Sequence, residues 1–474
     1  MEIAYYSVDA LKHSVDEFVR NDLIYGNGSE FKSLVTPTSV IISRDETRDL
    51  DCDLEKLWGL YRTWNQLYID SIDGDAHKRI RRNCEYGLNE SEIEVMRIVS
   101  RSRLEPRMTR IDYVTLGEDR KVAEVQWKSG GPGLFFGIQD VLSRTVEQGN
   151  GSESMGNLVD AFYRLICEKC RDEDSVAVND IRGGWTRGEE YLRKAYENRR
   201  LIYLPVDRAE ISSMIKQSGN NFFIRLDGKD YKIGFFYGYG WETFSKERLI
   251  ALAEGSVRGD IWIESPLNYI YREKWGMAMP FMREYKDMFD DRLRDILIPT
   301  ALIDSTSIDL SPIVPHIEHR ERERLLDVKS FEDFGDLGES LRKKLVFKCG
   351  SGTGDFYNRS RGVFRITGSR KAAENTLIIV KERVCEGEPW IVQEYIDRKY
   401  PVDMRLPYEI ETPEIVNAHA RFMIFGGMFG DEVGAMGGIG NFGRHWKVSG
   451  KAPVAGMGTQ TGTAFNDMRV RKYR

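Results

Sequence analysis

The sequence predicts a protein of the mixed α/β (α+β) class that is built from more than one domain. The chain has 474 residues, whereas a single hydrophobic core stops growing at about 250 to 300 residues. Helical periodicity dominates the first hundred residues, and period-two alternation typical of strands begins near Arg107 and recurs toward the C-terminal end. Helices and strands therefore alternate along most of the chain, as in layered α/β proteins.

The composition is that of an ordinary globular protein, with 41% hydrophobic and 30% charged residues. A formal net charge of −6 gives no general attraction to nucleic acid, so we expect none as a partner. The amino-terminal segment lacks the pattern of a secretory signal, and no apolar run reaches the length of a membrane span. We therefore expect a cytoplasmic protein that binds small molecules and no membrane.

The first expected unit, residues 1–105, is a helical cap. In DLEKLWGLYRTWNQLYIDSI the apolar and aromatic side chains recur every three or four residues. The next unit, residues 106–265, begins with a β-hairpin, because RIDYVTLG and KVAEVQW alternate around a turn at Gly117. An open α/β sheet follows, with strands SVAVNDI, RLIYLPV and GDIWIESP, and a second hairpin is expected around Asp227 and Gly228.

The third expected unit comprises residues 266–474, with a helical start in PLNYIYREKWGMAM and a linker near residue 310. Strands are expected at KLVFKC, GVFRIT, PWIVQEY and ARFMIFGG, and one helix, SRKAAENTLIIVKERV, separates the second from the third. The first chemical motif of the chain lies between the first two of these strands.

A glycine-rich loop with a preceding lysine is the first such motif. In FKCGSGTGDFYNRSRGVFRI, Lys348 ends a strand, and Gly350, Ser351, Gly352 and Gly354 follow. Glycines allow backbone N–H groups to converge on a phosphate without obstruction by Cβ atoms. The loop joins two strands, which fits neither a dinucleotide fingerprint nor a Walker A loop, and by itself it equally fits a plain turn.

In its context this segment resembles the lid of the ATP-grasp family, whose phosphate loop lies between two strands and follows a lysine. The helix and the hinge strand of that lid follow here in the same order, which implies an ATP-grasp fold with the lid at about residues 330–400. The resemblance implies that the backbone and the acidic side chain of the hinge strand hold adenine and ribose. The residues in those positions are Gln393, Glu394, Tyr395 and Ile396.

A second lysine belongs to the same resemblance. The family has an upstream Pro-x-Asn segment before a short helix that contains lysine, and this chain offers Pro266, Asn268 and Lys274. Two lysines that reach one triphosphate from different parts of the chain can neutralise charge during phosphoryl transfer. A solvated surface lysine is the alternative for Lys274, because charged residues precede it directly.

The hairpin near residue 110 resembles the Arg-x-Asp, turn, Glu-x-Asn hairpin of circularly permuted ATP-grasp enzymes, namely glutathionylspermidine synthetase and eukaryotic-type glutathione synthetase. The resemblance implies that Arg110 stabilises the transferring phosphoryl group and that Asp112, Glu124 and Gln126 bind Mg²⁺. Hard oxygen ligands of this kind suit Mg²⁺, and alternate strand residues share a face. Gln126 departs from the usual Asn, so its oxygen reaches one methylene farther.

Further candidates for phosphate, metal or substrate contact are Lys128, Arg421, Asn441 and Lys447, with Asp355 as a candidate third carboxylate. Taken together, the motifs predict an ATP-grasp carbon–nitrogen ligase that uses ATP and Mg²⁺, with Arg110, Lys274 and Lys348 as catalytic residues. Such an enzyme joins a carboxylate to an amine through an acyl phosphate and releases ADP. Two alternatives remain open: a phosphotransferase on the same scaffold, and an ATP-grasp-like binding protein without catalysis.

Overall fold

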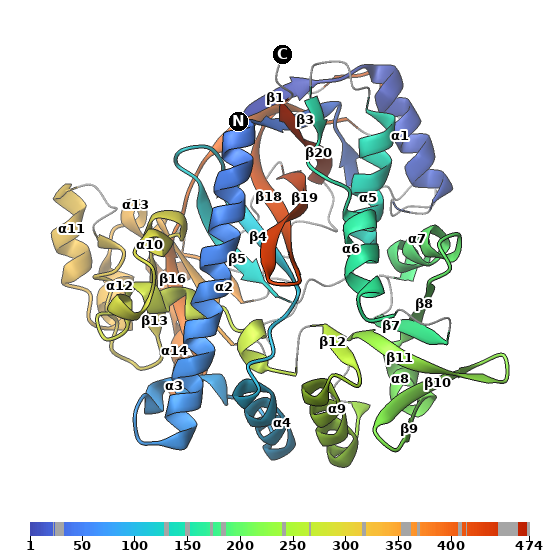
Figure 1. Cartoon of the computed structure of the whole chain (residues 1–474). Coiled ribbons are helices and arrows are strands. Elements are labelled where there is room, and N and C mark those ends of the chain that lie inside the picture. Colours follow the sequence, from blue (N-terminus) through green and yellow to red (C-terminus); the bar gives the residue numbers. More distant parts are fainter. Residues whose placement is uncertain are drawn as a thin grey trace.

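The computed structural model arranges the chain in three sheets with helices packed around them (Figure 1). Because some segments are not described, all statements about structure concern the following residues: 1–21, 23, 33–127, 132–146, 152–170, 174–181, 186–238, 243–264, 267–314, 319–351, 362–366, 370–405, 410–413, 415–443 and 463–471. Within these residues, no helix is at once long enough and apolar enough to cross a membrane.

The largest sheet draws on both ends of the chain and contains ten of the described strands. Its main order is β1-β3-β20-β19-β18-β4-β5; β17 pairs with β18, and β2 and β6 pair with β20. These strands are β1 (Glu2–Tyr5), β2 (Ser33–Val35), β3 (Thr38–Ile42), β4 (Met108–Thr115), β5 (Lys121–Gln126), β6 (Ser152–Ser154), β17 (Lys399–Asp403), β18 (Ile415–Phe429), β19 (Glu432–Gly443) and β20 (Thr463–Arg471). The β4/β5 hairpin confirms the strands expected there, and it joins the C-terminal strands through β18.

Two expectations about this part of the chain need correction. The first 42 residues are not purely helical, because β1 and β3 pair with each other and β3 runs parallel to β20. The reason is burial: all five residues of β3 are buried, including the polar Thr38 and Ser39, as expected for a strand with a partner on each side. The β4/β5 hairpin also belongs to a different sheet from the α/β strands that follow it in sequence.

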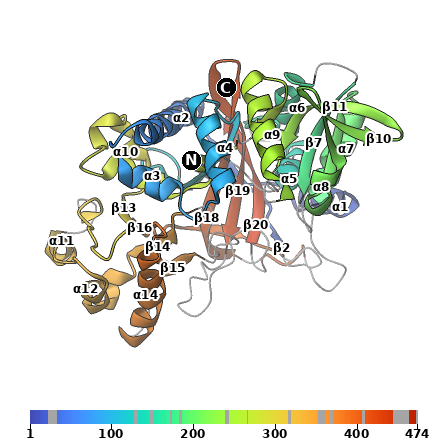
Figure 2. The ribbon, with the colours of Figure 1, turned by 90° about the horizontal axis from the view of Figure 1, so that it is seen from below.

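Helices cover both faces of the large sheet. Helix α2 packs on one face, while α5 and α6 pack on the other, and β18 separates them in Figure 2. The strand alternates accordingly: Phe422 and Ile424 belong to the core under α2, whereas Met423 and Phe425 belong to the core under α5 and α6. The helices of the first two thirds are α1 (Val8–Arg20), α2 (Arg44–Asp73), α3 (Lys78–Cys84), α4 (Glu90–Arg101), α5 (Pro132–Thr145), α6 (Leu158–Cys167), α7 (Thr186–Glu197), α8 (Arg208–Met214) and α9 (Lys246–Arg258).

The second sheet is the expected open α/β layer with an inserted hairpin. Its order is β8-β7-β11-β10-β9, with β12 beside β11, and β8, β7, β11 and β12 run parallel. The strands are β7 (Ser175–Ile181), β8 (Ile202–Asp207), β9 (Ile215–Ser218), β10 (Asn221–Leu226), β11 (Lys229–Tyr237) and β12 (Trp262–Glu264). At the predicted turn, Asp227 and Gly228 have φ values of 48° and 84°, as a type I′ turn requires.

The third sheet is antiparallel and has the order β13-β16-β14-β15. Its strands are β13 (Thr300–Ile303), β14 (Leu345–Cys349), β15 (Val363–Arg365) and β16 (Trp390–Glu394). The remaining helices are η2 (Tyr269–Arg272), η3 (Trp275–Phe281), η4 (Lys286–Met288), α10 (Arg292–Ile296), α11 (His319–Leu326), α12 (Phe331–Asp336), α13 (Glu339–Arg342) and α14 (Arg370–Cys385). Of these, η2 and α10 pack in the core under α2, whereas α11 to α14 pack with the third sheet. The glycine-rich loop therefore joins two paired strands, β14 and β15, as predicted.

The segment near residue 310 is not a linker. Ile308, Leu310 and Ile313 are each at most 1% exposed, and they pack into the core of the third sheet together with Phe347 and Trp390. Prolines and charged residues on either side suggested a connection between domains, but the apolar residues between them bury against the sheet. The helical expectation for residues 269–281 holds in a modified form, since η2 and η3 are 3-10 helices.

Candidate functional site

The β4/β5 hairpin places four polar side chains on one face of the large sheet. Arg110 lies opposite Gln126, and Asp112 lies opposite Glu124, so the two pairs are neighbours on the same side of the ladder. The residues between them, such as Ile111, point into the core under α2. The hairpin thus confirms the shared face that strand periodicity predicts.

Asp112 is the centre of a buried group of charges. Arg110 donates to both of its carboxylate oxygens, from Nε at 2.8 Å and from Nη2 at 3.1 Å. Nη1 of Arg421, a residue of β18, lies 3.3 Å from Oδ2. Asp112 is 1% exposed and Arg110 5% exposed, so these charges depend on one another for stabilisation. Arg421, a lesser sequence candidate, is thus part of the cluster.

Lys274 reaches this hairpin from the segment before η3. Its Nζ lies 3.1 Å from Oε1 of Glu124, and Nε2 of Gln126 donates to the same oxygen at 2.6 Å. The backbone N–H of Lys274 donates to the carbonyl of Gly350 at 2.7 Å, at the start of the glycine-rich loop. Asn268 stabilises the approach, because its side chain caps η2. The surface alternative for Lys274 does not hold, since only 16% of its side chain is exposed.

Lys348 reaches the same hairpin from β14. Its Nζ donates to the backbone carbonyl of Ala123 at 3.1 Å and also to Oε1 of Gln393. Gln393 in turn donates from Nε2 to Oγ1 of Thr300 at 2.9 Å. The two lysines, which are 74 positions apart in the sequence, therefore flank β5 together.

The electrostatics of the cluster are coupled. Burial acts to raise the pKa of Glu124, but the positive charges of Lys274, Lys348 and Arg110 outweigh it and lower the pKa to about 2. Burial lowers the pKa of Lys348 to about 8, although Glu124 opposes this change. Burial also lowers the pKa of the Arg421 guanidinium. Four cations, Arg110, Arg421, Lys274 and Lys348, thus lie near two carboxylates, Asp112 and Glu124, and this excess of positive charge suits the binding of an anion.

The start of the glycine-rich loop is packed tightly. A Cβ atom on Gly350 would lie 2.8 Å from the carbonyl oxygen of Pro389 and 2.8 Å from Cβ of Trp275, so no larger residue fits without displacement. Ser351 is buried. Gly352 and Gly354 lie outside the described residues, as do Pro266, Lys128, Asp355 and Lys447, and nothing is described of the side chain of Asn441.

The expected nucleobase segment continues directly from Gln393. The backbone N–H of Glu394 donates to the carbonyl of Pro299 at 3.3 Å, and that of Tyr395 donates to the carbonyl of Lys344 at 2.7 Å. Glu394, Tyr395 and Ile396 are all half-buried. Burial raises the pKa of Glu394, and the positive charges of Lys121, on β5, and Lys344 oppose this rise.

Sequence reasoning missed two residues of this stretch. Cζ of Arg365, on β15, lies 3.7 Å from the centre of the Tyr395 ring, and Lys121 is close enough to affect the pKa of Glu394. Alternation in VFR placed Arg365 on a strand but gave no sign of its partner. The stack forms because β15 pairs with β14, which lies beside β16.

The donor set of the hairpin suits Mg²⁺. Asp112, Glu124 and Gln126 offer two carboxylates and an amide oxygen, which are hard ligands of the kind that Mg²⁺ binds together with phosphate and water. Among the described residues, no group of three or more His, Cys, Asp or Glu side chains is placed to hold a metal ion. The remaining ligands would therefore come from the nucleotide, water or residues outside that part of the chain, and the metal assignment remains a prediction.

No protein-family model matches the chain, and no curated protein is detectably similar to it. The fold is similar to that of a glutathione synthetase-like effector from Globodera pallida solved in its apo form, with a TM-score of 0.50 and 11% sequence identity. The alignment covers 98% of this chain and 97% of that one. A candidate γ-glutamylcysteine synthetase from Methylobacillus flagellatus KT aligns over 86% of this chain and 87% of its own, at 12% identity, but its TM-score of 0.35 carries no argument. The chain therefore has a glutathione synthetase-like fold, in agreement with the ATP-grasp-like architecture expected from the motifs.

Proposed function

We propose that this protein is an ATP-dependent carbon–nitrogen ligase of the circularly permuted ATP-grasp type. An oxygen of a substrate carboxylate attacks the γ-phosphorus of ATP, so that an acyl phosphate forms and ADP leaves. The amine then attacks the acyl carbon, phosphate leaves, and an amide remains. The observation that carries this proposal is the convergence of Glu124, Lys274 and Lys348 on one hairpin next to Arg110 and Asp112.

The cationic side chains take the role of charge neutralisation. Lys274 and Lys348 bind the triphosphate from two sides, and Arg110 stabilises the transferring phosphoryl group through its planar set of donors. Without nucleotide, these cations are satisfied by Glu124, Asp112 and the carbonyl of Ala123. A triphosphate supplies stronger anionic partners, and this exchange requires no new protein nucleophile.

Asp112, Glu124 and Gln126 would hold Mg²⁺, which when bound polarises phosphoryl oxygens and neutralises their charge. Glu124 is suited to this role because its pKa of about 2 keeps the carboxylate ionised at neutral pH. In this arrangement Glu124 would serve the metal, and Lys274, which pairs with Glu124 at 3.1 Å, would serve the phosphates. Gln126 would reach the metal through a side chain that is one methylene longer than that of asparagine.

The nucleoside half of ATP would lie along the hinge. Gly350, Ser351, Gly352 and Gly354 form the phosphate loop, while Gln393, Glu394, Tyr395 and Ile396 surround the base and ribose. The half-buried carboxylate of Glu394 can accept hydrogen bonds from ribose hydroxyl groups. In this proposal residues 330–400 act as the lid, residues 106–265 hold the acceptor substrates, and the N-terminal helices up to residue 105 cover the site.

The proposal is tested by measuring ADP release with ATP, Mg²⁺ and panels of carboxylates and amines. Release should require one acid and one amine together, and Lys348→Met should reduce it by at least about 100-fold, since one charged contact to the transition state is worth several kcal/mol. Lys343→Met is the matched control, because Lys343 is exposed in the neighbouring turn and pairs with Glu339 on its own helix. Equal rates for the two variants would contradict the assignment.

An ATP-binding protein without catalysis is the second candidate. It is favoured by Gln126, which stands where the related hairpins have asparagine and donates to Glu124. For such a protein, ATP raises the melting temperature while no ADP appears with any substrate pair. A phosphotransferase instead leaves a stable phosphorylated product, which mass spectrometry distinguishes from an amide.

A further inference from the structure

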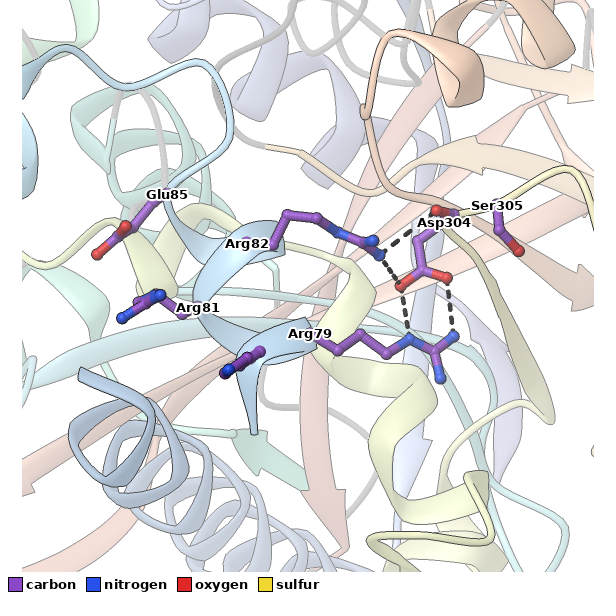
Figure 3. A pocket seen from close by; sticks show the side chains of 7 residues that line it. Arg79, Arg81, Arg82, Glu85, Asp304 and Ser305 are labelled. Carbon is purple, nitrogen blue, oxygen red and sulfur yellow. Dashed lines mark hydrogen bonds and ion pairs between the residues drawn. The ribbon is translucent and has the colours of Figure 1, made fainter. Parts of the chain in front are cut away.

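A basic cavity lies away from the candidate ATP site, where α3 meets the end of β13 (Figure 3). Its volume is about 740 Å³, which is within the range of small-molecule sites. Four cationic side chains of α3 line it, namely Lys78, Arg79, Arg81 and Arg82, with the acidic Glu85 and Asp304. Asp304 directly follows β13, and at about 3.3 Å per residue it is roughly 13 Å along the strand from Thr300, which contacts the ATP-site residue Gln393.

One side of this cavity is a closed network that shapes it. Arg79 donates to both oxygens of Asp304, at 2.6 and 2.8 Å, and Arg82 donates to the same carboxylate at 2.9 Å. Asn83 adds a further hydrogen bond at 2.9 Å. Figure 3 shows Arg79 and Arg82 pointing toward Asp304. Asp304 therefore holds α3 against the third sheet and offsets Arg79 and Arg82, which leaves Lys78 and Arg81 as the cations that it does not contact.

The open side of the cavity has more positive than negative charge. Lys78 and Arg81 are three residues apart, which puts them on neighbouring positions of α3, and Glu85 follows at the end of the helix. In Figure 3 Arg81 points away from Asp304, whereas Arg82 points toward it. Glu85 is already held by two hydrogen bonds from Arg97 and one from Tyr68. Lys78 pairs with Asp75, but their side chains are 63% and 94% exposed, so this pair contributes little.

Arg81 is the least satisfied of these cations. Within the described part of the chain, its guanidinium makes a single hydrogen bond, to the carbonyl of Ser71 at 3.5 Å. The side chain of Arg82 is 56% exposed, and it contacts Asp304 through Nη2, not through Nη1. A guanidinium has five N–H donors in a planar array that matches phosphate and carboxylate oxygens.

We propose that this cavity binds a small polyanion, a compound with two or more phosphate or carboxylate groups, on Lys78 and Arg81. The site is open to solvent, so a compact ligand can enter it, and two anionic groups are needed to engage Lys78 and Arg81 together. The site is independent of the proposed ligase function, because none of its residues belongs to the ATP cluster. Its position at the end of β13 also places it against the sheet that carries Lys348.

Calorimetric titration with tripolyphosphate and with citrate at low salt tests the proposal. Lys78→Gln/Arg81→Gln should weaken binding by at least about tenfold, because it removes two charged donors that take no part in the Asp304 network. Arg101→Gln/Lys246→Gln is the matched control: it removes the same two charges from exposed surface pairs with Asp73 and Glu94. The control should change the affinity less than twofold. Melting temperatures of both variants should equal that of the wild type.

Because tripolyphosphate also resembles the phosphates of ATP, the titrations are repeated in Lys348→Ala. Saturable binding that survives this change and is weakened by Lys78→Gln/Arg81→Gln supports the site. Binding by tripolyphosphate alone identifies a phosphate ligand, and binding by citrate alone identifies a carboxylate ligand. The proposal is overturned if neither compound binds, if the pocket and control variants bind equally, or if binding disappears only in Lys348→Ala.

Discussion

Replacing Glu124 with glutamine should destabilise the protein far more than an ordinary loss of a surface ion pair. The substitution preserves size and shape but leaves Lys274 and Lys348 without the carboxylate that faces them. A pKa lowered from 4.5 to about 2 corresponds to about 3 kcal/mol of stabilisation of the charged form. One fifth of the Glu124 side chain is exposed, so solvent screening reduces this figure, and we expect a loss of about 2 kcal/mol at pH 7.

Urea unfolding of wild type and Glu124→Gln at several pH values measures this loss. Since the pKa is lowered on folding, the carboxylate stabilises the protein fully above the pKa of the unfolded chain, about 4.5, and loses its effect as pH falls toward about 2. The difference between the two proteins should therefore shrink by roughly a quarter between pH 7 and pH 4.

Glu105→Gln is the matched control, because the Glu105 side chain is as exposed as that of Glu124, at 22%, but its hydrogen bonds come from one half-exposed cation, Arg62. This surface pair should contribute less than about 1 kcal/mol. If Glu124→Gln costs no more than Glu105→Gln, or if its cost does not change with pH, then the cluster of charges around Glu124 is not organised as described.

Three further predictions concern other parts of the molecule. ATP affinity should fall as pH rises through about 8, because Lys348 loses its proton there, and calorimetry from pH 7 to 9.5 should show no such fall in Lys348→Met. Gly350→Ala should lower stability by about 1 to 3 kcal/mol, since the new methyl group meets two atoms at 2.8 Å; Gly338→Ala, whose nearest atom is 3.9 Å away, should be close to neutral in the same unfolding assay. Leu310→Ala should cost about 2 to 5 kcal/mol, as for a core leucine, and a cost near zero would restore the interpretation of this segment as a linker.

Local signals in the sequence were sufficient for most individual elements. The turn at Asp227 and Gly228 could be predicted because few residues accept two positive φ angles in succession. Alternation predicted that Arg110 shares a face with Asp112 and that Glu124 shares one with Gln126, since side chains repeat every two residues on any strand. The pairing register of β4 with β5 then put both pairs on the same face. The order of residues along the chain likewise predicted that Lys348 precedes a glycine-rich loop between two strands, which are β14 and β15.

The tertiary structure decided which of these elements meet. Arg421 reaches Asp112 only because β18 pairs with β4 across about 300 residues of chain, and β3 becomes a central strand only because it adds to β20. Turn and strand preferences act over a few neighbouring residues, whereas pairing between distant strands depends on which apolar faces can be buried together. For the same reason, the sequence indicated two lysines and two carboxylates as candidate site residues, but it did not indicate which of them meet. Folding brought Lys274 to Glu124 and Lys348 to the carbonyl of Ala123.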